Sequence, residues 1–269
     1  MSDAALILKS ISKTFNTGTI NEKVALNNVS LTLYKGDFAT IIGSNGAGKS
    51  TLLNAIAGVW PIDKGQILLS NKDVTGLPDY KRAAYVGRVF QDPMTGTAAD
   101  MQIIENLALS ARRGKHRTLK WQYRKNEKDE YVKMLSQFHL GLENRLTSKV
   151  GLLSGGQRQA LTLLMASMTK PEILLLDEHT AALDPSTAST VLSLTNQIIE
   201  KDNLTALMVT HNMKDAINNG NRLIMMHEGR IIYDVRGEEK KNLTVDALLA
   251  KFAEVSGTTF ASDEALLTK

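Results

Sequence analysis

Residues 43–50 read Gly-Ser-Asn-Gly-Ala-Gly-Lys-Ser and match the pattern G-x-x-x-x-G-K-S/T. The apolar run Phe38–Ile42 in front of them is typical of a short strand, and apolar residues recur at helical spacing from Leu52 to Ala57, until Gly58. This order of strand, glycine loop and helix lets the backbone N–H groups of residues 45 to 50 turn inward at the positive end of a helix. The stretch therefore predicts an α/β fold with a phosphate-binding loop.

The same loop supplies candidate ligands for a nucleoside triphosphate. Lys49 is placed to reach the β and γ phosphates, and the Ser50 hydroxyl to ligate Mg²⁺ while Thr51 touches the α phosphate. The alternative is a glycine-rich turn that contains Lys-Ser by chance, and the strand before it and the helix after it weigh against that interpretation. The predicted nucleotide-binding residues are Gly43, Ser44, Asn45, Gly46, Ala47, Gly48, Lys49, Ser50 and Thr51.

Two carboxylates follow the apolar run Ile173–Leu176, which comes after Pro171 and is typical of a strand buried on both faces. Asp177 and Glu178 would then lie at the carboxyl edge of the sheet, where α/β folds bind their ligands. Asp177 is the candidate for holding Mg²⁺, and Glu178 for orienting or deprotonating an attacking water. Exposed loop acids are the alternative, which the leucine-rich strand and the upstream phosphate loop make the weaker one.

A second glycine-containing helix start is predicted at Leu153-Ser-Gly-Gly-Gln157. Ser154 and Gln157 have the spacing of a capping box, and apolar residues at helical spacing follow from Leu161 to Met168. Capping accounts for the serine and the glutamine but requires neither Gly155 nor Gly156. Because those glycines leave backbone N–H groups uncovered, we expect a second phosphate site here.

Taken in this order, the motifs resemble those of the ATP-binding subunit of an ATP-binding cassette (ABC) transporter, and the resemblance covers about residues 5–235. It implies an α/β P-loop NTPase fold with a mixed sheet core, an antiparallel β subdomain and an inserted helical subdomain at about residues 92–156. The cassette domain would comprise residues 1–236. Residues 237–269 would form a tail, in which Val245, Leu248, Leu249 and Phe252 predict a short amphipathic helix.

The resemblance also implies roles for residues outside the phosphate loop. Ser154, Gly155, Gly156 and Gln157 would close over the γ phosphate of an ATP held by a second cassette, so that a head-to-tail pair encloses two ATP molecules. Gln91 would touch Mg²⁺ and link to the helical subdomain. His211 would contact the γ phosphate and act with Glu178 and Gln91 in catalysis. Alone, a histidine after a strand is more often structural and a loop glutamine solvent-facing; their order in the chain favours the functional roles.

Two further positions match the family with an alternative left open. Asp184 resembles the loop that passes between subunits, or it simply caps the helix predicted to begin at Pro185. Phe15 is placed to stack on adenine, where the family often has tyrosine, or it is an ordinary core residue. The predicted metal ligands are Ser50, Gln91 and Asp177, and the predicted cofactors are ATP and Mg²⁺.

The chain departs from the family at His179, where proline commonly follows the catalytic glutamate. The substitution removes a fixed φ and places a titratable ring beside the candidate base. We favour a variant without effect on catalysis. The alternative, that His179 tunes the site, predicts that His179→Pro shifts the pH profile of hydrolysis.

The composition limits where the chain can work. Its 269 residues include no cysteine, which excludes disulfides and thiolate metal sites and fits a reducing compartment. The first ten residues lack the charged and apolar regions of a signal peptide, and no stretch approaches the roughly 18 apolar residues of a spanning helix. We therefore expect a cytoplasmic location, peripheral on the cytoplasmic face of the cell membrane.

The formal net charge of +4 is concentrated between Ala111 and Asp129, where eight basic residues are interleaved with Trp121 and Tyr123. A solvated helical face is the favoured interpretation. A contact with a partner or with lipid headgroups is the main alternative, and nucleic acid the weakest one.

Because no spanning segment is expected, the resemblance implies that ATP closure and hydrolysis switch a separate membrane permease between two states. The motifs look importer-like, similar to ATPases paired with binding-protein-dependent permeases, some assigned to aromatic amino acids. Expected partners are a second cassette, identical or not, permease subunits and, indirectly, an external binding protein. No nucleic acid is expected. The alternatives are a cassette ATPase that acts on nucleic acid or ribosomes and an ATP-binding regulator without turnover.

Overall fold

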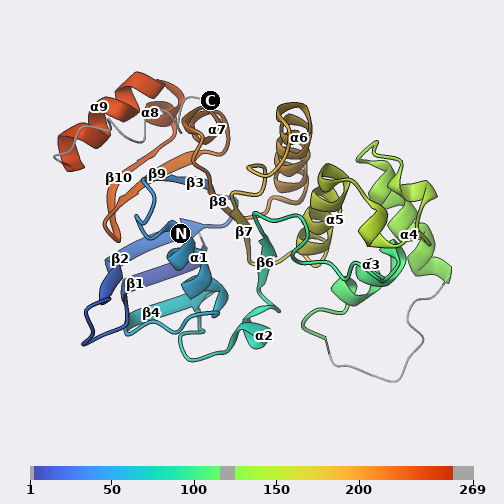
Figure 1. The fold of residues 1–269 in the computed structure, drawn as a ribbon, viewed down its shortest axis with the longest axis horizontal. Coiled ribbons are helices and arrows are strands. Elements are labelled where there is room, and N and C mark those ends of the chain that lie inside the picture. The colour runs from blue at the N-terminus through green and yellow to red at the C-terminus, as the bar shows by residue number, and fades with distance from the viewer. Residues whose placement is uncertain (1–2, 116–124, 257–269) are drawn as a thin grey trace.

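The computed structural model describes residues 3–115 and 125–256 and contains two sheets with helices around them. Figure 1 shows the antiparallel strands near the N-terminus on one side of the molecule and a group of helices on the opposite side, with the second sheet between them. The predicted basic segment lies partly in residues 116–124, outside the described residues. The α/β fold class predicted from the sequence is confirmed.

The first sheet is antiparallel and has the strand order β2-β1-β4-β5. Its strands are β1 (Ala4–Phe15), β2 (Lys23–Tyr34), β4 (Lys64–Leu69) and β5 (Lys72–Asp73). Its longest pairing joins β1 to β2, with Phe15 opposite Lys23 at one end. Because of this pairing, Phe15 at the end of β1 lies beside the start of β2, at one end of the sheet.

The second sheet has six strands in the order β10-β9-β3-β8-β7-β6. The strands are β3 (Phe38–Ile42), β6 (Val86–Val89), β7 (Ile173–Asp177), β8 (Ala206–Val209), β9 (Arg222–His227) and β10 (Arg230–Arg236). All neighbours pair in parallel except β9 and β10, so the sheet is mixed. The two apolar runs expected to be strands, Phe38–Ile42 and Ile173–Leu176, are β3 and β7, which lie on either side of β8 in the middle of this sheet.

The helices are arranged around the two sheets. The helical elements are α1 (Lys49–Ala57), α2 (Asp79–Arg82), α3 (Ile103–Ala111), α4 (Lys125–Ser136), the 3₁₀ helices Leu142–Asn144 and Val150–Leu152, α5 (Gly155–Ser167), α6 (Pro185–Asp202), α7 (Met213–Asn218), α8 (Glu238–Lys241) and α9 (Val245–Ser256). Figure 1 shows α3, α4 and α5 together at one end, and α7, α8 and α9 near β9 and β10. The amphipathic tail helix is confirmed as α9, which buries Leu248 and Phe252. Across the described ranges, no helix is both long and apolar enough to cross a bilayer.

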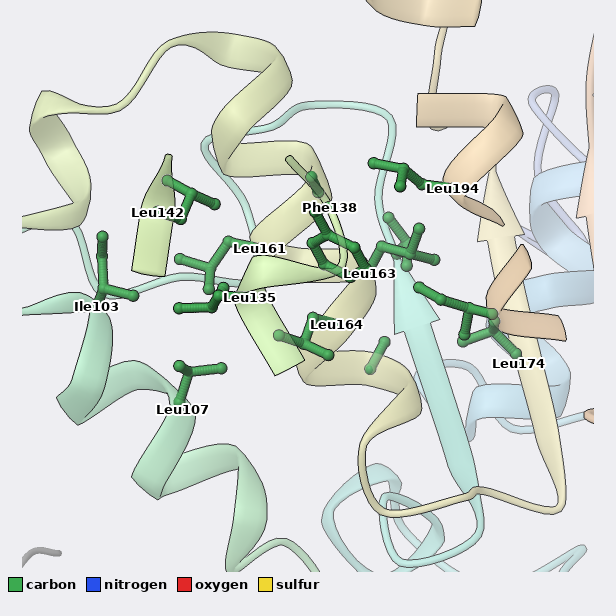
Figure 2. Close-up of a cluster of buried hydrophobic side chains, with 14 of the residues drawn as sticks. Ile103, Leu107, Leu135, Phe138, Leu142, Leu161, Leu163, Leu164, Leu174 and Leu194 are labelled. Carbon is green, nitrogen blue, oxygen red and sulfur yellow. The ribbon is translucent and has the colours of Figure 1, made fainter. Parts of the chain in front are cut away.

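Strand β7 is buried on both faces because its side chains alternate between two cores. Leu174 and Leu176 belong to the cluster shared with the helical group, shown in Figure 2, where Leu174 lies beside residues of α5 and α6. Ile173 and Leu175 belong to the cluster that joins α1 to both sheets. Packing on both sides fixes the strand and so the position of Asp177 at its end.

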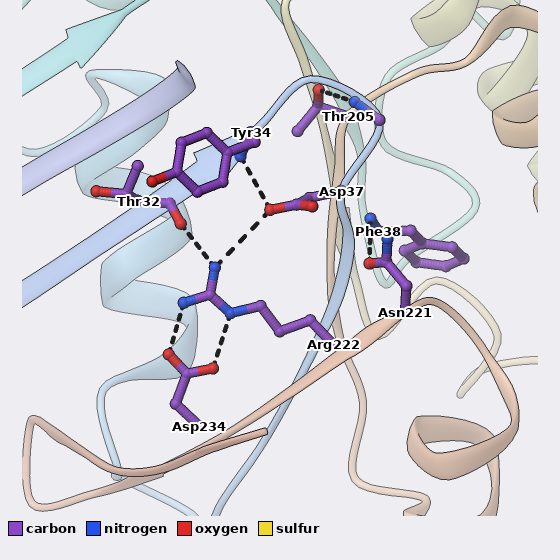
Figure 3. Close-up of polar contacts among 9 residues, drawn as sticks. Thr32, Tyr34, Asp37, Phe38, Thr205, Asn221, Arg222 and Asp234 are labelled. Atoms are coloured by element: carbon purple, nitrogen blue, oxygen red, sulfur yellow. Dashed lines mark hydrogen bonds and ion pairs between the residues drawn. The ribbon is translucent and has the colours of Figure 1, made fainter. Parts of the chain in front are cut away.

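Arg222 ties the two sheets together through a buried guanidinium (Figure 3). Its Nε and Nη2 donate to Asp234 of β10 at 2.7 and 2.5 Å, and its Nη1 donates to the Thr32 carbonyl of β2 at 2.6 Å. A second carboxylate, Asp37, lies 3.8 Å from Nη1. A bidentate pair with arginine has a fixed geometry, so this network sets the position of β2 relative to the six-stranded sheet. Because β1 pairs with β2, it also sets the position of Phe15 at the end of β1.

Candidate nucleotide-binding and catalytic site

The glycine loop between β3 and α1 is held in shape by its own lysine. The Lys49 Nζ donates to the carbonyls of Gly43 and Ser44 at 2.7 and 3.1 Å, and only 7% of the residue is exposed. Gly48, the N-cap of α1, has φ 99°, and a Cβ built there would lie 2.4 Å from the Ala25 carbonyl oxygen. Only glycine fits that position, and its lack of a side chain leaves the helix start uncapped.

A cavity of about 240 Å³ opens over this loop. It is lined by Phe15, Lys23, Ala25, Asn45, Gly46, Ala47, Gly48, Lys49, Ser50, Thr51 and Glu178. The fold thus brings together three predicted parts that are far apart in the sequence: Phe15, the phosphate loop and Glu178. Lys23 and Ala25 were not predicted from the sequence, and they reach the cavity because β2 pairs with β1.

Phe15 is held in place by two neighbours at the edge of this cavity. Its ring meets Trp60 edge-on at 4.9 Å between centroids and an interplanar angle of 79°. The Lys13 Nζ lies 5.5 Å from the same ring centroid and pairs with Asp63 at 2.9 Å. These contacts fix the ring, as a stacking platform for a planar base requires.

Two oxygen atoms that could bind a metal ion lie close together at the end of β7. The Ser50 hydroxyl donates to Asp177 Oδ1 at 3.5 Å, and the other carboxylate oxygen pairs with Arg88 Nη2 at 3.3 Å. Burial raises the pKa of Asp177, an effect that the Arg88 guanidinium opposes. A hydroxyl and a carboxylate are ligands that suit Mg²⁺, which usually takes few protein ligands and completes its shell with phosphates and water. Within the described ranges, no three His, Cys, Asp or Glu side chains gather as a metal-ligand set.

Glu178 and His211 face each other beside the phosphate loop. Glu178 Oε2 lies 3.5 Å from His211 Nδ1. The hydrogen bond with His211 lowers the pKa of Glu178, and the same bond raises the pKa of His211. Glu178 has φ 44°, a strained conformation for a residue with a side chain, and such strain is typical of functional positions. The pair keeps Glu178 ionised, as a general base must be.

The remaining predicted residues of the family motifs lie away from the cavity. Gln91 follows β6, is exposed and is not among the residues that line the cavity. Its neighbour Phe90 is tied by its carbonyl to Gln159 of α5. The link between the Gln91 loop and the helical group is thus made by the backbone next to it.

The start of α5 is a closed capping box, as the sequence predicted. The Ser154 hydroxyl accepts from the Gln157 backbone N–H at 3.3 Å, and the Gln157 side chain accepts from the Ser154 N–H at 3.2 Å. Gln157 Nε2 also donates to the Leu140 carbonyl at 3.2 Å. Gly155 is exposed and Gly156 buried. None of the four residues from Ser154 to Gln157 lines the cavity.

Asp184 caps α6, where its Oδ1 accepts from the Thr187 backbone N–H at 3.1 Å. The capping alternative is therefore observed within the chain. A role between subunits stays a prediction.

Gln159 is a functional candidate that sequence reasoning missed. It is fully buried, and its Nε2 donates to the carbonyls of Phe90 and His179 at 2.8 and 2.7 Å. These carbonyls belong to the residues next to Gln91 and Glu178. One amide from the capping-box helix thus joins the two loops, a connection that only the tertiary structure reveals.

His179 points away from the cavity into the core. Its side chain is buried, and its Nε2 lies 3.0 Å from the Thr195 hydroxyl, which itself donates to the Val191 carbonyl. The hydroxyl oxygen therefore accepts from His179, which makes the ring the neutral Nε2–H tautomer. Burial lowers the pKa of His179 to about 4.

A glycine loop at a helix start, with a carboxylate at the end of a parallel strand two places away in the same sheet, defines a P-loop nucleoside triphosphatase. Residues 26–181, more than half of the chain, match the family described as ABC transporter, so the chain belongs to that family. It is the ATP-binding and ATP-hydrolysing subunit, and the expectation of a transport ATPase is confirmed.

The relatives and structural neighbours agree with this family. The tyrosine transport ATP-binding protein of Clostridioides difficile (strain R20291) is 47% identical over 247 residues, covering 92% of this chain and 98% of the relative. The phosphonates import ATP-binding protein PhnC 2 of Cupriavidus metallidurans is 31% identical, covering 91% and 88%.

Two solved structures show the same architecture. The ADP conformation of MJ1267, an ATP-binding cassette of an ABC transporter, superposes with a TM-score of 0.76 at 30% identity, covering 94% of this chain and 98% of that one. The dimeric post-hydrolysis state of the cassette MJ0796, bound to ADP and Pi, superposes with 0.72 at 29% identity, covering 86% and 98%.

Proposed function

We propose that this chain works as one of a pair of cassettes that use ATP and Mg²⁺ to drive a membrane permease importing an aromatic amino acid. The pair would sit on the cytoplasmic face of the membrane, with an external binding protein delivering the cargo to the permease. The cassette domain would comprise residues 1–236, with the helical subdomain at about 92–156 and the tail at 237–269.

The proposal that two cassettes pair is supported by one observation: the two glycine-containing helix starts of a single chain do not lie at the same cavity. The phosphate loop, Phe15 and Glu178 line one cavity, whereas Ser154 and Gly155 lie outside it and expose a glycine-containing helix start. A second copy would supply that helix start to the γ phosphate. The dimeric structure of the MJ0796 cassette supports this arrangement.

Within each site the chain's own residues would have distinct roles. Ser50 and Asp177 would hold Mg²⁺, with Gln91 as a further ligand, and the bound ion would neutralise negative charge on the phosphates. Glu178 would orient the attacking water and accept its proton. His211 would keep Glu178 ionised and contact the γ phosphate. Phe15 would stack on the adenine.

The cargo assignment rests on the relatives. The relative with 47% identity over nearly its whole length is named for tyrosine transport, and others at 31–34% are named for import of phosphonates, methionine or spermidine and putrescine. The shared direction supports import. The much higher identity of the first supports an aromatic amino acid as cargo.

The pairing is tested with Glu178→Gln, which we expect to bind ATP but to release phosphate on the order of 10²-fold more slowly, or slower still. With ATP and Mg²⁺ this variant should change from monomer to dimer in light scattering. Adding Gly155→Asp should abolish the dimer without weakening ATP binding by the monomer, because an acid suits an exposed helix start but repels a γ phosphate. Gly155→Ala is the matched control. A dimer that survives Gly155→Asp would contradict the pairing.

The cargo is tested by uptake of labelled tyrosine, phenylalanine and tryptophan into cells that lack this chain. Restoring the wild type should restore uptake of at least one of the three, and restoring Glu178→Gln should not. Labelled methionine is the control. Uptake of all three aromatic amino acids that is independent of the chain would contradict the assignment.

A further inference from the structure

Arg88 is a charged residue in a place where the sheet is otherwise apolar. It lies in β6 opposite Leu175 of β7, and its side chain is only 14% exposed. Its guanidinium packs on Phe90, with Cζ 4.5 Å from the ring centroid. A buried cation costs free energy unless it is paired, so its partners show why it is there.

Those partners connect two of the proposed Mg²⁺ ligands, Asp177 and Ser50. Arg88 Nη2 pairs with Asp177 Oδ2 at 3.3 Å, and Nη1 donates to Asn54 Oδ1 at 2.8 Å. Asn54 in turn donates from Nδ2 to the Ser50 carbonyl at 2.8 Å. The guanidinium therefore links the end of β7 to the first turns of α1, and the free oxygen of Asp177 is left facing the Ser50 hydroxyl.

We propose that Arg88 is a positioning residue for the metal site: it acts as a permanent counter-ion that orients Asp177 before Mg²⁺ arrives and then weakens Mg²⁺ binding. This inference rests on the proposed role of Asp177 as a metal ligand. Arg88 occupies one carboxylate oxygen and leaves the other toward Ser50, so metal and guanidinium share one carboxylate. As a fixed positive charge beside a divalent cation, Arg88 raises the Mg²⁺ concentration that the site needs.

Neutral replacement should therefore have two opposite effects. Without Arg88, Asp177 is a largely buried carboxylate that has lost its ion-pair partner, so the metal-free protein loses stability. The repulsion is lost as well, so Mg²⁺ binds more tightly. Charge repulsion within a few ångströms outweighs the ordering that Arg88 supplies, and we expect a fall of about tenfold or more in the Mg²⁺ concentration required.

The experiment measures Mg²⁺ binding without turnover. The affinity for ADP is measured by calorimetry at a series of Mg²⁺ concentrations, and the midpoint of its rise gives the Mg²⁺ concentration that the site requires. Melting temperatures are recorded with and without Mg²⁺. The proteins compared are the wild type, Arg88→Met, Arg88→Gln, Arg88→Lys and Asp177→Asn. Methionine matches the length of arginine and can still pack on Phe90. Glutamine serves if the methionine variant does not fold, and lysine keeps the charge without the two-armed contact to Asn54 and Asp177.

For either neutral variant we expect a Mg²⁺ midpoint about tenfold lower than wild type, a metal-free melting temperature several degrees lower, and a larger rise on adding Mg²⁺ alone. Arg88→Lys should keep a midpoint near that of the wild type. An unchanged or higher midpoint in the neutral variants would overturn the proposal. Asp177→Asn is a separate test: if its ADP affinity still rises with Mg²⁺ as in the wild type, the metal role of Asp177 fails.

Discussion

The starts of α1 and α5 are both glycine-containing, yet they are built in different ways. At α1 the N-cap is Gly48 with φ 99°, and the loop before it lines a cavity of the same chain. At α5 the N-cap is Ser154 with φ −64°, its capping box is closed, and the helix start lies outside that cavity. The start of α1 therefore belongs to a cavity formed within one chain. The start of α5 is closed by its own capping box and is exposed at Ser154 and Gly155.

The glycines differ in what surrounds them, and this separates folding from binding. A Cβ at Gly48 would lie 2.4 Å from the Ala25 carbonyl oxygen, and a Cβ at Gly156 would lie 2.1 Å from Thr187 Cγ2. At Gly155 the nearest contact would be Leu183 Cδ2 at an ordinary 3.4 Å. Packing within the chain explains Gly48 and Gly156 but not Gly155, which agrees with the proposal that a second cassette uses this helix start.

Gly48→Ala is expected to have the largest effect, because it combines an unfavourable φ with a backbone clash. We expect a loss of about 3–5 kcal/mol of unfolding free energy and loss of ATP binding by the monomer. Gly155→Ala is the matched control and should change stability by no more than about 0.5 kcal/mol. Urea denaturation and ATP titration of both variants measure the difference. Equal effects would remove the distinction between the two helix starts.

The next largest effect is expected at His179, which follows Glu178 and whose carbonyl accepts from Gln159 of α5. The folded pKa of about 4 lies below the ordinary 6.5, so the unfolded chain binds more protons between these values. Stability is therefore lost as the pH falls from 6.5 towards 4, by roughly 3 kcal/mol.

His179→Gln, which retains a donor for Thr195, should lack this acid-induced loss in urea denaturation at pH 7 and pH 4. The pH profile of ATP hydrolysis above pH 6.5 should be the same in the wild type and in His179→Pro, because the buried ring stays neutral there. A shifted profile would show that His179 tunes the catalytic site after all.

Gly156→Ala is expected to cost about 1–3 kcal/mol, the usual range for overpacking. The clash involves a single methyl group, Thr187 Cγ2, so Thr187→Ser should relieve it while keeping the backbone N–H that donates to Asp184. Melting temperatures of the two single variants and the double variant form a cycle that measures the coupling. If Thr187→Ser fails to rescue Gly156→Ala, this glycine has another role, such as approach to a second chain.

Much of this fold could be predicted because its signals are local. The runs at β3, β7 and β8 are continuously apolar, as strands buried on both faces must be, and the capping box at Ser154 marks the start of α5 in sequence alone. The order of the motifs was enough to indicate Lys49, Asp177 and Glu178.

What could not be predicted depends on neighbours that are remote in sequence. The partners of Arg88 follow from the pairing of β6 with β7 and from the position of α1, and nothing near Arg88 in the chain indicates them. In the same way, nothing near Gly156 in the sequence indicates Thr187, which the packing of α5 on α6 brings against it.

The smallest effect is expected for the His211–Glu178 pair, which belongs to the site formed within one chain. The folded pKa of His211 lies above 6.5, so its contribution is present below pH 6.5 and lost as the pH rises through the raised value. The folded pKa of Glu178 lies below 4.5, so its contribution is present above pH 4.5 and lost on acidification through the lowered value. The pair is thus strongest between about pH 4.5 and 6.5.

His211→Gln should lower the melting temperature at pH 6 but not at pH 9. Because the His211 side chain is 46% exposed, solvent screens the pair, and the difference should stay within about 1 kcal/mol, or a few degrees at most. High salt should reduce it further. If the variant is destabilised equally at both pH values, His211 stabilises the fold by packing, and the electrostatic account of how Glu178 stays ionised would have to be abandoned.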